Sequence, residues 1–434
     1  MALPVVPVRA DPVQPPRTGV VVIGGGIIGV CTALYLAEQG VPVVLCEKGI
    51  IAGEQSSRNL GWCRKMGRDP RELPLIIESM RLWAGMDQHV QGNTGFTTCG
   101  TLYFADNKEE LDKHEAWLEH ARAYQLDTRL VTNADIHRIM PGAAGHWAGG
   151  LYTPSDGRAE PQQAAPAIAE AARRAGATIL TNCAVRGVET KGGRVAAVVT
   201  ERGRIDCETV VLAGGAWSRL FCGNLGIELP SLKILGSVFR THPLQGPPET
   251  SAGGAEFSFR KRLDGGYSIS RRGGSISELT PDSFRLFFDF LPSLTKSWRE
   301  LRLRVGRRFI EEWRIPRRWS LDAITPFEQV RVLDPAPAEK SLAEAREKLA
   351  AAFPAFKGMR VAESWAGLID VTPDAVPVIS PVDSVPGFFL ATGFSGHGFG
   401  IGPGAGKLAA DLVAGDTPVV DPAPYRYARF RKPL

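Results

Sequence analysis

The chain has 434 residues, 44% of them hydrophobic and 22% charged, which is long enough for two domains with separate cores. The net charge of +5 is small and scattered, which argues against a nucleic-acid-binding protein. Seven cysteines, an odd number without a C-x-x-C spacing, indicate reduced thiols of a cytoplasmic protein and exclude a disulfide framework or a zinc site; we expect no metal.

The first residues predict neither a signal peptide nor a membrane anchor. Residues 1–16 are rich in Pro and Val, and they lack a basic start followed by an apolar core, so we expect a flexible arm. The apolar run at residues 20–36 is interrupted by four glycines. No segment of the sequence predicts a transmembrane helix.

Residues 20–29, with the sequence VVVIGGGIIG, predict a buried strand and a G-x-G-x-x-G turn, and a helix is expected over 30–39. Gly24 allows the tight turn, Gly26 lets the backbone approach a pyrophosphate, and Gly29 lets the helix pack on the strand. The amides at the helix start, next to Ile27 and Ile28, would face the phosphates.

A second strand over 43–45 ends next to Glu47, about 20 residues after the turn. An acid at this place can bind ribose hydroxyls and disfavours a 2′-phosphate, so the ligand is FAD or NAD rather than NADP. A Gly-rich structural turn is the alternative. Strand, turn, helix, strand and acid in this order favour the dinucleotide.

Residues 51–62 form a polar loop just beyond the second strand, where doubly wound sheets bind ligands. Its hydroxyls and amides could hold a pyrophosphate, and Trp62 could lie near a flavin ring. An ordinary surface loop is the alternative. The candidate ligands here are Lys48, Gly53, Gln55, Ser56, Ser57, Arg58, Asn59 and Leu60.

The middle of the chain alternates helices and strands. Helices are predicted over 74–86, 107–123 and 162–175, and strands over 150–157, 178–180, 184–188, 195–200, 203–205 and 210–217. The last strand ends in glycines that would let the backbone approach a cofactor. Val185, Gly214 and Trp217 are therefore further cofactor candidates.

From residue 231 the pattern changes to half-exposed strands over 236–241 and 266–271, and a helix is predicted over 341–352. Between them, residues 283–319 predict a helical stretch with aromatic residues and many arginines. This stretch could face a membrane surface or an acidic partner. A solvated helix face is favoured, because Glu300, Glu311 and Glu312 interleave with the arginines.

Near the C-terminus, strands predicted over 376–379 and 387–393 lead into a second Gly-rich stretch and a helix over 404–414. Such a turn can direct N–H groups at the edge of a reduced flavin. A histidine alone is more often structural, but its flanking glycines favour a flavin neighbour here. The candidates are Gly393, Gly396, His397, Gly398, Phe399, Gly400 and Ile401.

Together these stretches resemble the D-amino-acid-oxidase-like superfamily of FAD flavoproteins over residues 18–432. Within it, the chain is most similar to the membrane-associated bacterial L-amino acid deaminases. The match is carried by residues 51–58 (IAGEQSSR), 181–195, 210–227, 325–329 (TPFEQ) and 420–432.

The resemblance implies an α/β fold, α+β overall, with a Rossmann-like FAD-binding domain of the glutathione-reductase type and a mixed-sheet substrate domain. The FAD-binding domain would comprise residues 17–95, 145–230 and 360–434. The substrate domain would comprise residues 96–144 and 231–359, with a helical insertion at about 276–325.

The resemblance also implies oxidation of L-α-amino acids to 2-oxo acids and ammonia, by hydride transfer from Cα to flavin N5 and hydrolysis of the imino acid. Arg272 falls on the position of the carboxylate-binding arginine, and a guanidinium suits a carboxylate because it binds it in a bidentate manner. Arg271 would point to the opposite face of its strand. Trp62, Trp365, Val238 and Phe399 are the other candidates for the substrate pocket.

The sequence departs from the deaminases in three places. It has a Pro-rich arm instead of their N-terminal membrane helix, their substrate-site glutamine is replaced around Val238–Phe239, and the loop at 395–398 is closer to D-amino-acid dehydrogenases and sarcosine oxidases. Oxidation of D-amino acids or N-methyl amino acids is therefore an alternative. A non-catalytic flavin-binding subunit and an NAD-dependent dehydrogenase are others.

We expect FAD to be bound noncovalently, because no cysteine follows Cys222 and no histidine lies between Gly24 and Arg64. The electron acceptor would be oxygen or a quinone or cytochrome. The expected location is the cytoplasm, with peripheral contact to the inner membrane and a homo-oligomer both left open.

Overall fold

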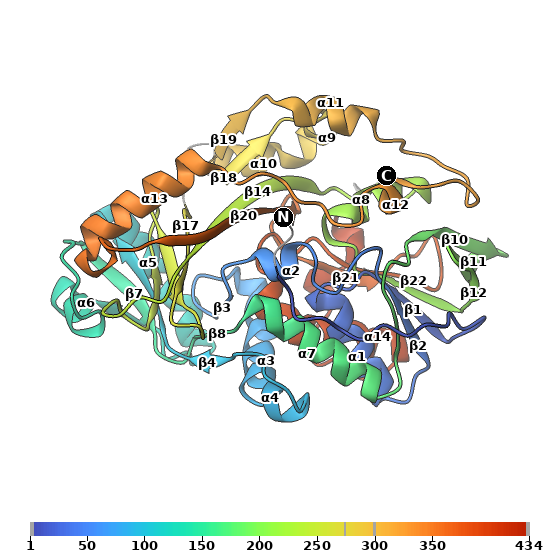
Figure 1. The fold of residues 1–434 in the computed structure, drawn as a ribbon, viewed down its shortest axis with the longest axis horizontal. Coiled ribbons are helices and arrows are strands. Elements are labelled where there is room, and N and C mark those ends of the chain that lie inside the picture. Colours follow the sequence, from blue (N-terminus) through green and yellow to red (C-terminus); the bar gives the residue numbers. More distant parts are fainter. Residues whose placement is uncertain (1–3, 273–274, 298–300, 431–434) are drawn as a thin grey trace.

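A computed structural model describes residues 4–272, 275–297 and 301–430. The start of the expected arm, part of the expected insertion including Glu300, and the last four residues lie outside this range. No helix within it is both long and apolar enough to span a membrane. The nucleotide-binding part and a large second sheet lie side by side, and residues 276–325 cover one edge of both (Figure 1).

The first sheet has the order β21-β22-β13-β1-β2-β9, with parallel pairing from β22 to β9. Its central strands are buried on both faces, which explains their unbroken apolar sequences. The strands are β1 (Val20–Ile23), β2 (Val43–Cys46), β9 (Thr178–Leu180), β13 (Thr209–Leu212), β21 (Val378–Pro381) and β22 (Phe388–Thr392).

Helices α1 (Ile27–Glu38), α3 (Leu73–Ala84), α7 (Pro161–Arg174) and α14 (Gly398–Ala414) pack together beside this sheet (Figure 1). All four begin earlier than predicted, α3 and α7 by one residue, α1 by three and α14 by six. Helix α14 continues through Pro403 because its glycines fit closely against α1, where a Cβ on Gly402 would lie 2.6 Å from Ile27.

The second large sheet has the order β19-β18-β14-β17-β16-β15-β5-β7-β6, and β20 pairs with β14. Strands β7 and β20 belong to segments that the expected boundaries give to the FAD-binding domain, so the chain crosses between the sheets inside these segments. The strands are β5 (Thr101–Ala105), β6 (Arg129–Val131), β7 (Gly149–Thr153), β14 (Leu232–Thr241), β15 (Ser251–Gly253), β16 (Ser258–Lys261), β17 (Tyr267–Ser270), β18 (Ser275–Glu278), β19 (Leu301–Arg304) and β20 (Val361–Val371).

The remaining elements are short or lie at the periphery. Two small sheets pair β10 (Val185–Lys191), β11 (Arg194–Thr200) and β12 (Gly203–Asp206), and β3 (Trp62–Cys63), β4 (Thr97–Thr98) and β8 (Gly157–Arg158). The other helices are α2 (Gln55–Arg58), α4 (Met86–His89), α5 (Lys108–Ala123), α6 (Asn133–Ile139), α8 (Ser218–Asn224), α9 (Pro281–Arg285), α10 (Phe287–Ser297), α11 (Arg307–Arg314), α12 (Pro326–Gln329) and α13 (Glu339–Ala352).

Three expectations about local structure were wrong. The stretch 283–319 is not helical throughout, because β19 runs parallel to β18, and its alternation Leu-Arg-Leu-Arg is typical of a strand. The loop after β2 contains the short helix α2. The strand predicted over 210–217 ends at Leu212, and the last residues of the predicted range, Gly215–Trp217, form a 3₁₀ turn instead.

The described part of the N-terminal segment is held to the body rather than loose. The backbone amides of Val6 and Asp11 donate to the carbonyls of Gln162 (3.1 Å) and Ile179 (2.8 Å). Val5 and Val8 pack against the core of the first sheet.

A buried ion pair joins the two sheets. Arg260 on β16 and Glu160 at the start of α7 are almost fully buried, and two N–O contacts of 2.6 and 3.0 Å connect them. Burial alone would raise the pKa of Glu160, but Arg260, Arg262 and the Leu263 amide hold this pKa below its usual value.

We predict that Arg260→Met lowers the free energy of unfolding by about 3–5 kcal/mol, because Glu160 is left buried without its guanidinium partner. Urea unfolding followed by circular dichroism measures the change. Lys261→Met is the control, since this half-buried neighbour pairs with the exposed Glu249 and its loss should change the free energy by less than about 1 kcal/mol. Equal losses in the two variants would contradict the prediction.

Candidate active site

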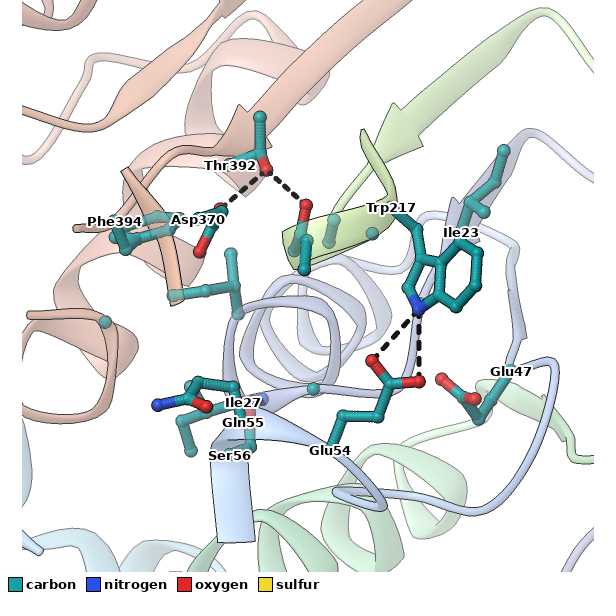
Figure 2. A pocket seen from close by; sticks show the side chains of 18 of the residues that line it. Ile23, Ile27, Glu47, Glu54, Gln55, Ser56, Trp217, Asp370, Thr392 and Phe394 are labelled. Atoms are coloured by element: carbon teal, nitrogen blue, oxygen red, sulfur yellow. Dashed lines mark hydrogen bonds between the residues drawn. The ribbon is translucent and has the colours of Figure 1, made fainter. Parts of the chain in front are cut away.

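A cleft of about 1250 Å³ opens at the carboxyl ends of β1, β2, β13 and β22, where a sheet of this kind binds its ligand. It brings together segments more than 350 residues apart in the sequence, as Figure 2 shows for Ile23, Glu47, Trp217 and Phe394. The predicted residues that line it are Gly24, Gly26, Ile27, Ile28, Glu47, Lys48, Gly53, Gln55, Ser56, Asn59, Val185, Gly214, Trp217, Gly396, Gly398 and Phe399.

The Gly-rich turn has the geometry that a pyrophosphate requires. Gly24 has φ +108°, and a Cβ there would lie 2.5 Å from the Ala213 carbonyl oxygen. Gly26, the residue before α1, has no side chain of its own to cap the helix, whose start lines the cleft. The Ile27 amide donates to Ser56 Oγ at 2.8 Å, which ties the turn to α2 (Figure 2).

Two backbone amides hold the carboxylate of the acid that follows β2. Glu47 Oε2 accepts the Gly25 amide and Oε1 accepts the Gly49 amide, both at 2.7 Å. Burial raises the pKa of Glu47, although Lys48 and these two amides oppose the shift. The carboxylate is thus fixed against the Gly-rich turn, at the edge of the cleft where a ribose is expected.

Sequence reasoning missed a second acid that lines the cleft, Glu54. Its two oxygens accept from Trp217 Nε1 at 3.1 and 3.0 Å (Figure 2), and one of them also accepts from Lys48 Nζ at 2.6 Å. Trp217 lies 163 residues further along the chain, so only the place of Glu54 between Gly53 and Gln55 could have pointed to it.

Asp370 on β20 was also missed. It lines the cleft beside Thr392 and accepts the Gly393 amide at 2.6 Å and Thr392 Oγ1 at 3.1 Å (Figure 2). Burial raises the pKa of this carboxyl. Gly393 itself does not line the cleft, but its amide positions this acid.

Several predicted cofactor ligands do not line the cleft: Gly29, Ser57, Arg58, Leu60, Gly393, His397, Gly400 and Ile401. Arg58 is fully buried and joins three segments, because its guanidinium donates to Asp334 Oδ1 at 2.6 Å and to the carbonyls of Ala366 and Gly53. Its role in the structure is therefore to fix the loop after β2 rather than to face a ligand.

His397 faces Glu72 rather than the cleft. Its Nδ1 lies 3.0 Å from Glu72 Oε2, and burial, with a further contribution from Arg68, lowers its pKa to about 4. The histidine precedes α14, while its neighbours Gly398 and Phe399 line the cleft. Of this turn, Gly398 and Phe399 therefore line the cleft, and His397 contacts Glu72 instead.

The predicted substrate-side residues lie next to the cleft. Val238 and Trp365 contact each other and Leu60, and Trp365 Nε1 donates to the Arg58 carbonyl at 2.9 Å. The Trp62 ring lies 5.9 Å from that of Tyr103. These residues form an apolar wall beyond the loop after β2.

The two consecutive arginines after β17 separate as expected, although β17 ends at Ser270 and both lie beyond it. Arg271 pairs with Glu344 on α13 and with Glu256. The Arg272 guanidinium lies 3.8 Å from the centre of the Tyr103 ring. Arg272 is thus on the same side as Trp62, and Arg271 is held elsewhere.

The cleft fits FAD on its own features. The turn that lines the cleft has no side chain at Gly24 or Gly26, where a diphosphate would bind, and the fixed Glu47 carboxylate could bind a ribose. Gln55 Oε1 is buried in the cleft wall without a hydrogen-bond partner within the described chain, as expected for a group that meets a ligand.

Comparison with known proteins agrees with this fit. The structure of L-amino acid deaminase from Proteus myxofaciens in complex with anthranilate superimposes with a TM-score of 0.94, at 34% identity over 99% of this chain and 97% of that one. Among sequences, the chain is similar to glycine oxidase of Pseudomonas aeruginosa (26% identity, 94% of this chain and 97% of the relative). It is also similar to sarcosine oxidase subunit beta of Rhodobacter capsulatus (24% identity, 93% and 87%).

The model of the DAO family, FAD dependent oxidoreductase, matches residues 19–412. This range includes both strand-to-helix turns of the cleft and the substrate-side wall. The chain therefore belongs to the DAO family of FAD-dependent oxidoreductases, as an amino acid oxidoreductase that uses FAD.

Proposed function

We propose that this protein oxidises L-α-amino acids to 2-oxo acids and ammonia. The observation that carries the proposal is Arg272, a guanidinium held over Tyr103 beside the cofactor cleft, where a substrate carboxylate would need a fixed cation. The similarity to an L-amino acid deaminase over nearly the whole chain supports the same substrate class.

In this proposal the protein mainly positions its substrate. Arg272 binds the α-carboxylate, and the apolar wall of Leu60, Val238 and Trp365 holds the carbon chain. Bound FAD supplies the acceptor for the hydride that leaves Cα. The amine must be neutral at that moment, and water hydrolyses the imino acid product.

Oxidation of D-amino acids or N-methyl amino acids is the second candidate, because the sequence relatives are named glycine oxidase and sarcosine oxidase. The handedness of the substrate depends on which side of Cα the carboxylate clamp and the apolar wall occupy. Oxygen and a membrane quinone or cytochrome remain the candidate electron acceptors.

We predict that L-amino acids, and not their D-isomers, bleach the flavin absorbance of the purified protein without oxygen. Stopped-flow spectra with matched L and D panels and sarcosine measure this. Bleaching only by D-isomers or by sarcosine would overturn the proposal.

We also expect heat denaturation to release the flavin into the supernatant, since we propose noncovalent binding.

We predict that Arg272→Ala raises KM strongly while FAD stays bound, because the loss of a charged partner for a buried carboxylate costs about 2–5 kcal/mol. Steady-state kinetics with the best L-amino acid, together with the flavin content, test this. Arg271→Ala is the matched control, because Arg271 is held by Glu344 and Glu256. An unchanged KM in Arg272→Ala would refute the role.

We further propose that the insertion docks on an anionic membrane surface. Its exposed side chains include Phe288 (76% exposed), Val305 (77%) and Trp313 (67%). Glu312, one of the acids expected to interleave with the arginines, is turned inward and pairs with Lys233 and Arg308. Among the described residues of the insertion, the exposed arginines Arg285, Arg304, Arg307, Arg314 and Arg318 outnumber the exposed acids Asp289, Glu311 and Asp322.

The membrane proposal predicts co-sedimentation with vesicles that contain phosphatidylglycerol, and weaker binding to pure phosphatidylcholine. Replacing Phe288 and Trp313 by Ser should reduce binding to the anionic vesicles, because both aromatic anchors are lost. Ser substitution of Tyr124, an exposed aromatic residue at the end of α5 and outside the insertion, is the control. No binding to anionic vesicles would contradict the proposal.

A further inference from the structure

Three guanidinium groups gather near one aromatic ring beside the cofactor cleft. The Arg272 and Arg64 guanidinium carbons lie 3.8 and 5.2 Å from the centre of the Tyr103 ring. Arg68 is only 4% exposed, and its Nε donates to the Arg64 carbonyl at 3.3 Å. We call Arg64, Arg68 and Arg272 the arginine cluster.

One member of the arginine cluster lacks an acceptor. Within the described chain, the buried Nη1 of Arg68 has no hydrogen-bond partner. Burial, followed by the charge of Arg64, lowers the pKa of Arg68 to about 10, so it is still charged at neutral pH. A buried N–H donor without an acceptor is costly unless a ligand supplies one.

The buried acids near the arginine cluster are already engaged. Glu72 lies 3.0 Å from Nδ1 of His397. Asp156 accepts the backbone amides of Lys65 and Met66, and burial raises its pKa to about 6. Both acids still act on Arg68 and raise its pKa, but the cluster places three guanidinium groups near these two carboxyls, and an anionic ligand would reduce this excess of positive charge.

The arginine cluster adjoins the flavin end of the cleft. A Cβ on Gly400 would lie 3.2 Å from the Trp62 carbonyl oxygen and 3.6 Å from Arg68 Nη2, and the preceding residue, Phe399, lines the cleft. A molecule held by Arg272 next to the flavin would thus extend toward Arg64 and Arg68.

We propose that the preferred substrates carry a second carboxylate, as aspartate and glutamate do. This inference rests on the proposed function. One bidentate guanidinium suffices for one carboxylate, so Arg272 takes the α-carboxylate, and Arg64 with Arg68 receives the side-chain carboxylate. Arg64 and Arg272 approach the same ring, which places them within reach of the two ends of a short dicarboxylate.

A pair of non-reducing ligands of equal length tests the subsite directly. Glutarate and pentanoate both have five carbons and differ by one carboxylate, and binding to the FAD-loaded protein is followed by the shift of the flavin spectrum. We expect glutarate to bind at least about tenfold more tightly. Equal affinities, or no binding of either ligand, would overturn the inference.

Arg64→Gln should remove the preference for glutarate while the affinity for pentanoate stays within about twofold. Lys65→Gln is the matched control, because it also removes one positive charge, at the position next to Arg64. The Lys65 side chain donates to Ser155 Oγ at 2.5 Å. If Arg64→Gln weakens both ligands equally, Arg64 belongs to the α-carboxylate clamp and the second subsite is refuted.

The outcome separates this inference from the proposed function. Reduction of the flavin by neutral L-amino acids, with no preference for glutarate over pentanoate, would leave the proposed function standing and refute the second subsite. Failure of every L-amino acid to reduce the flavin would refute the proposed function, and the ligand pair would still decide whether the subsite exists.

Discussion

The ion pair between Arg260 and Glu160 fixes how the cofactor cleft and the substrate wall face each other. Glu160 precedes α7, a helix that packs beside the first sheet, and Arg260 lies on β16 of the second sheet. The same guanidinium donates to the Leu60 carbonyl at 2.5 Å, so it also holds the loop after β2. Three parts of the chain thus meet at one buried charge, and hydride transfer depends on their relative placement because Cα must lie against the flavin.

Charge is distributed unequally along the cleft and the region beside it. The acids Glu47 and Glu54 lie near the start of the cleft, each held by backbone amides or by Trp217 and Lys48. The arginine cluster lies near the flavin end. An acid near ribose hydroxyls and cations near a carboxylate are both favourable, so the two ends suit the two different molecules that must meet there.

Local patterns in the sequence predicted the nucleotide-binding strands, the Gly-rich turn and the acid after β2, because residues close in sequence determine each of them. Roles that depend on distant partners were not predictable. Arg58 looked like a ligand because it sits in a polar loop, and its true partners, Asp334 and Ala366, follow about 300 residues later. His397 was misjudged for the same reason, since Glu72 comes from the start of α3.

The relatives of this chain are named for different substrates although they share its fold, and the structure suggests why. The cofactor cleft is formed by turns and strand ends that the fold itself creates, such as the starts of α1 and α14. The proposed substrate contacts are instead single side chains such as Val238, Trp365 and Arg64, which can change without disturbing a strand or a turn. Substrate preference would then depend on these side chains and on Arg68, whose buried Nη1 has no hydrogen-bond partner within the described chain and would stay unsatisfied beside an apolar substrate.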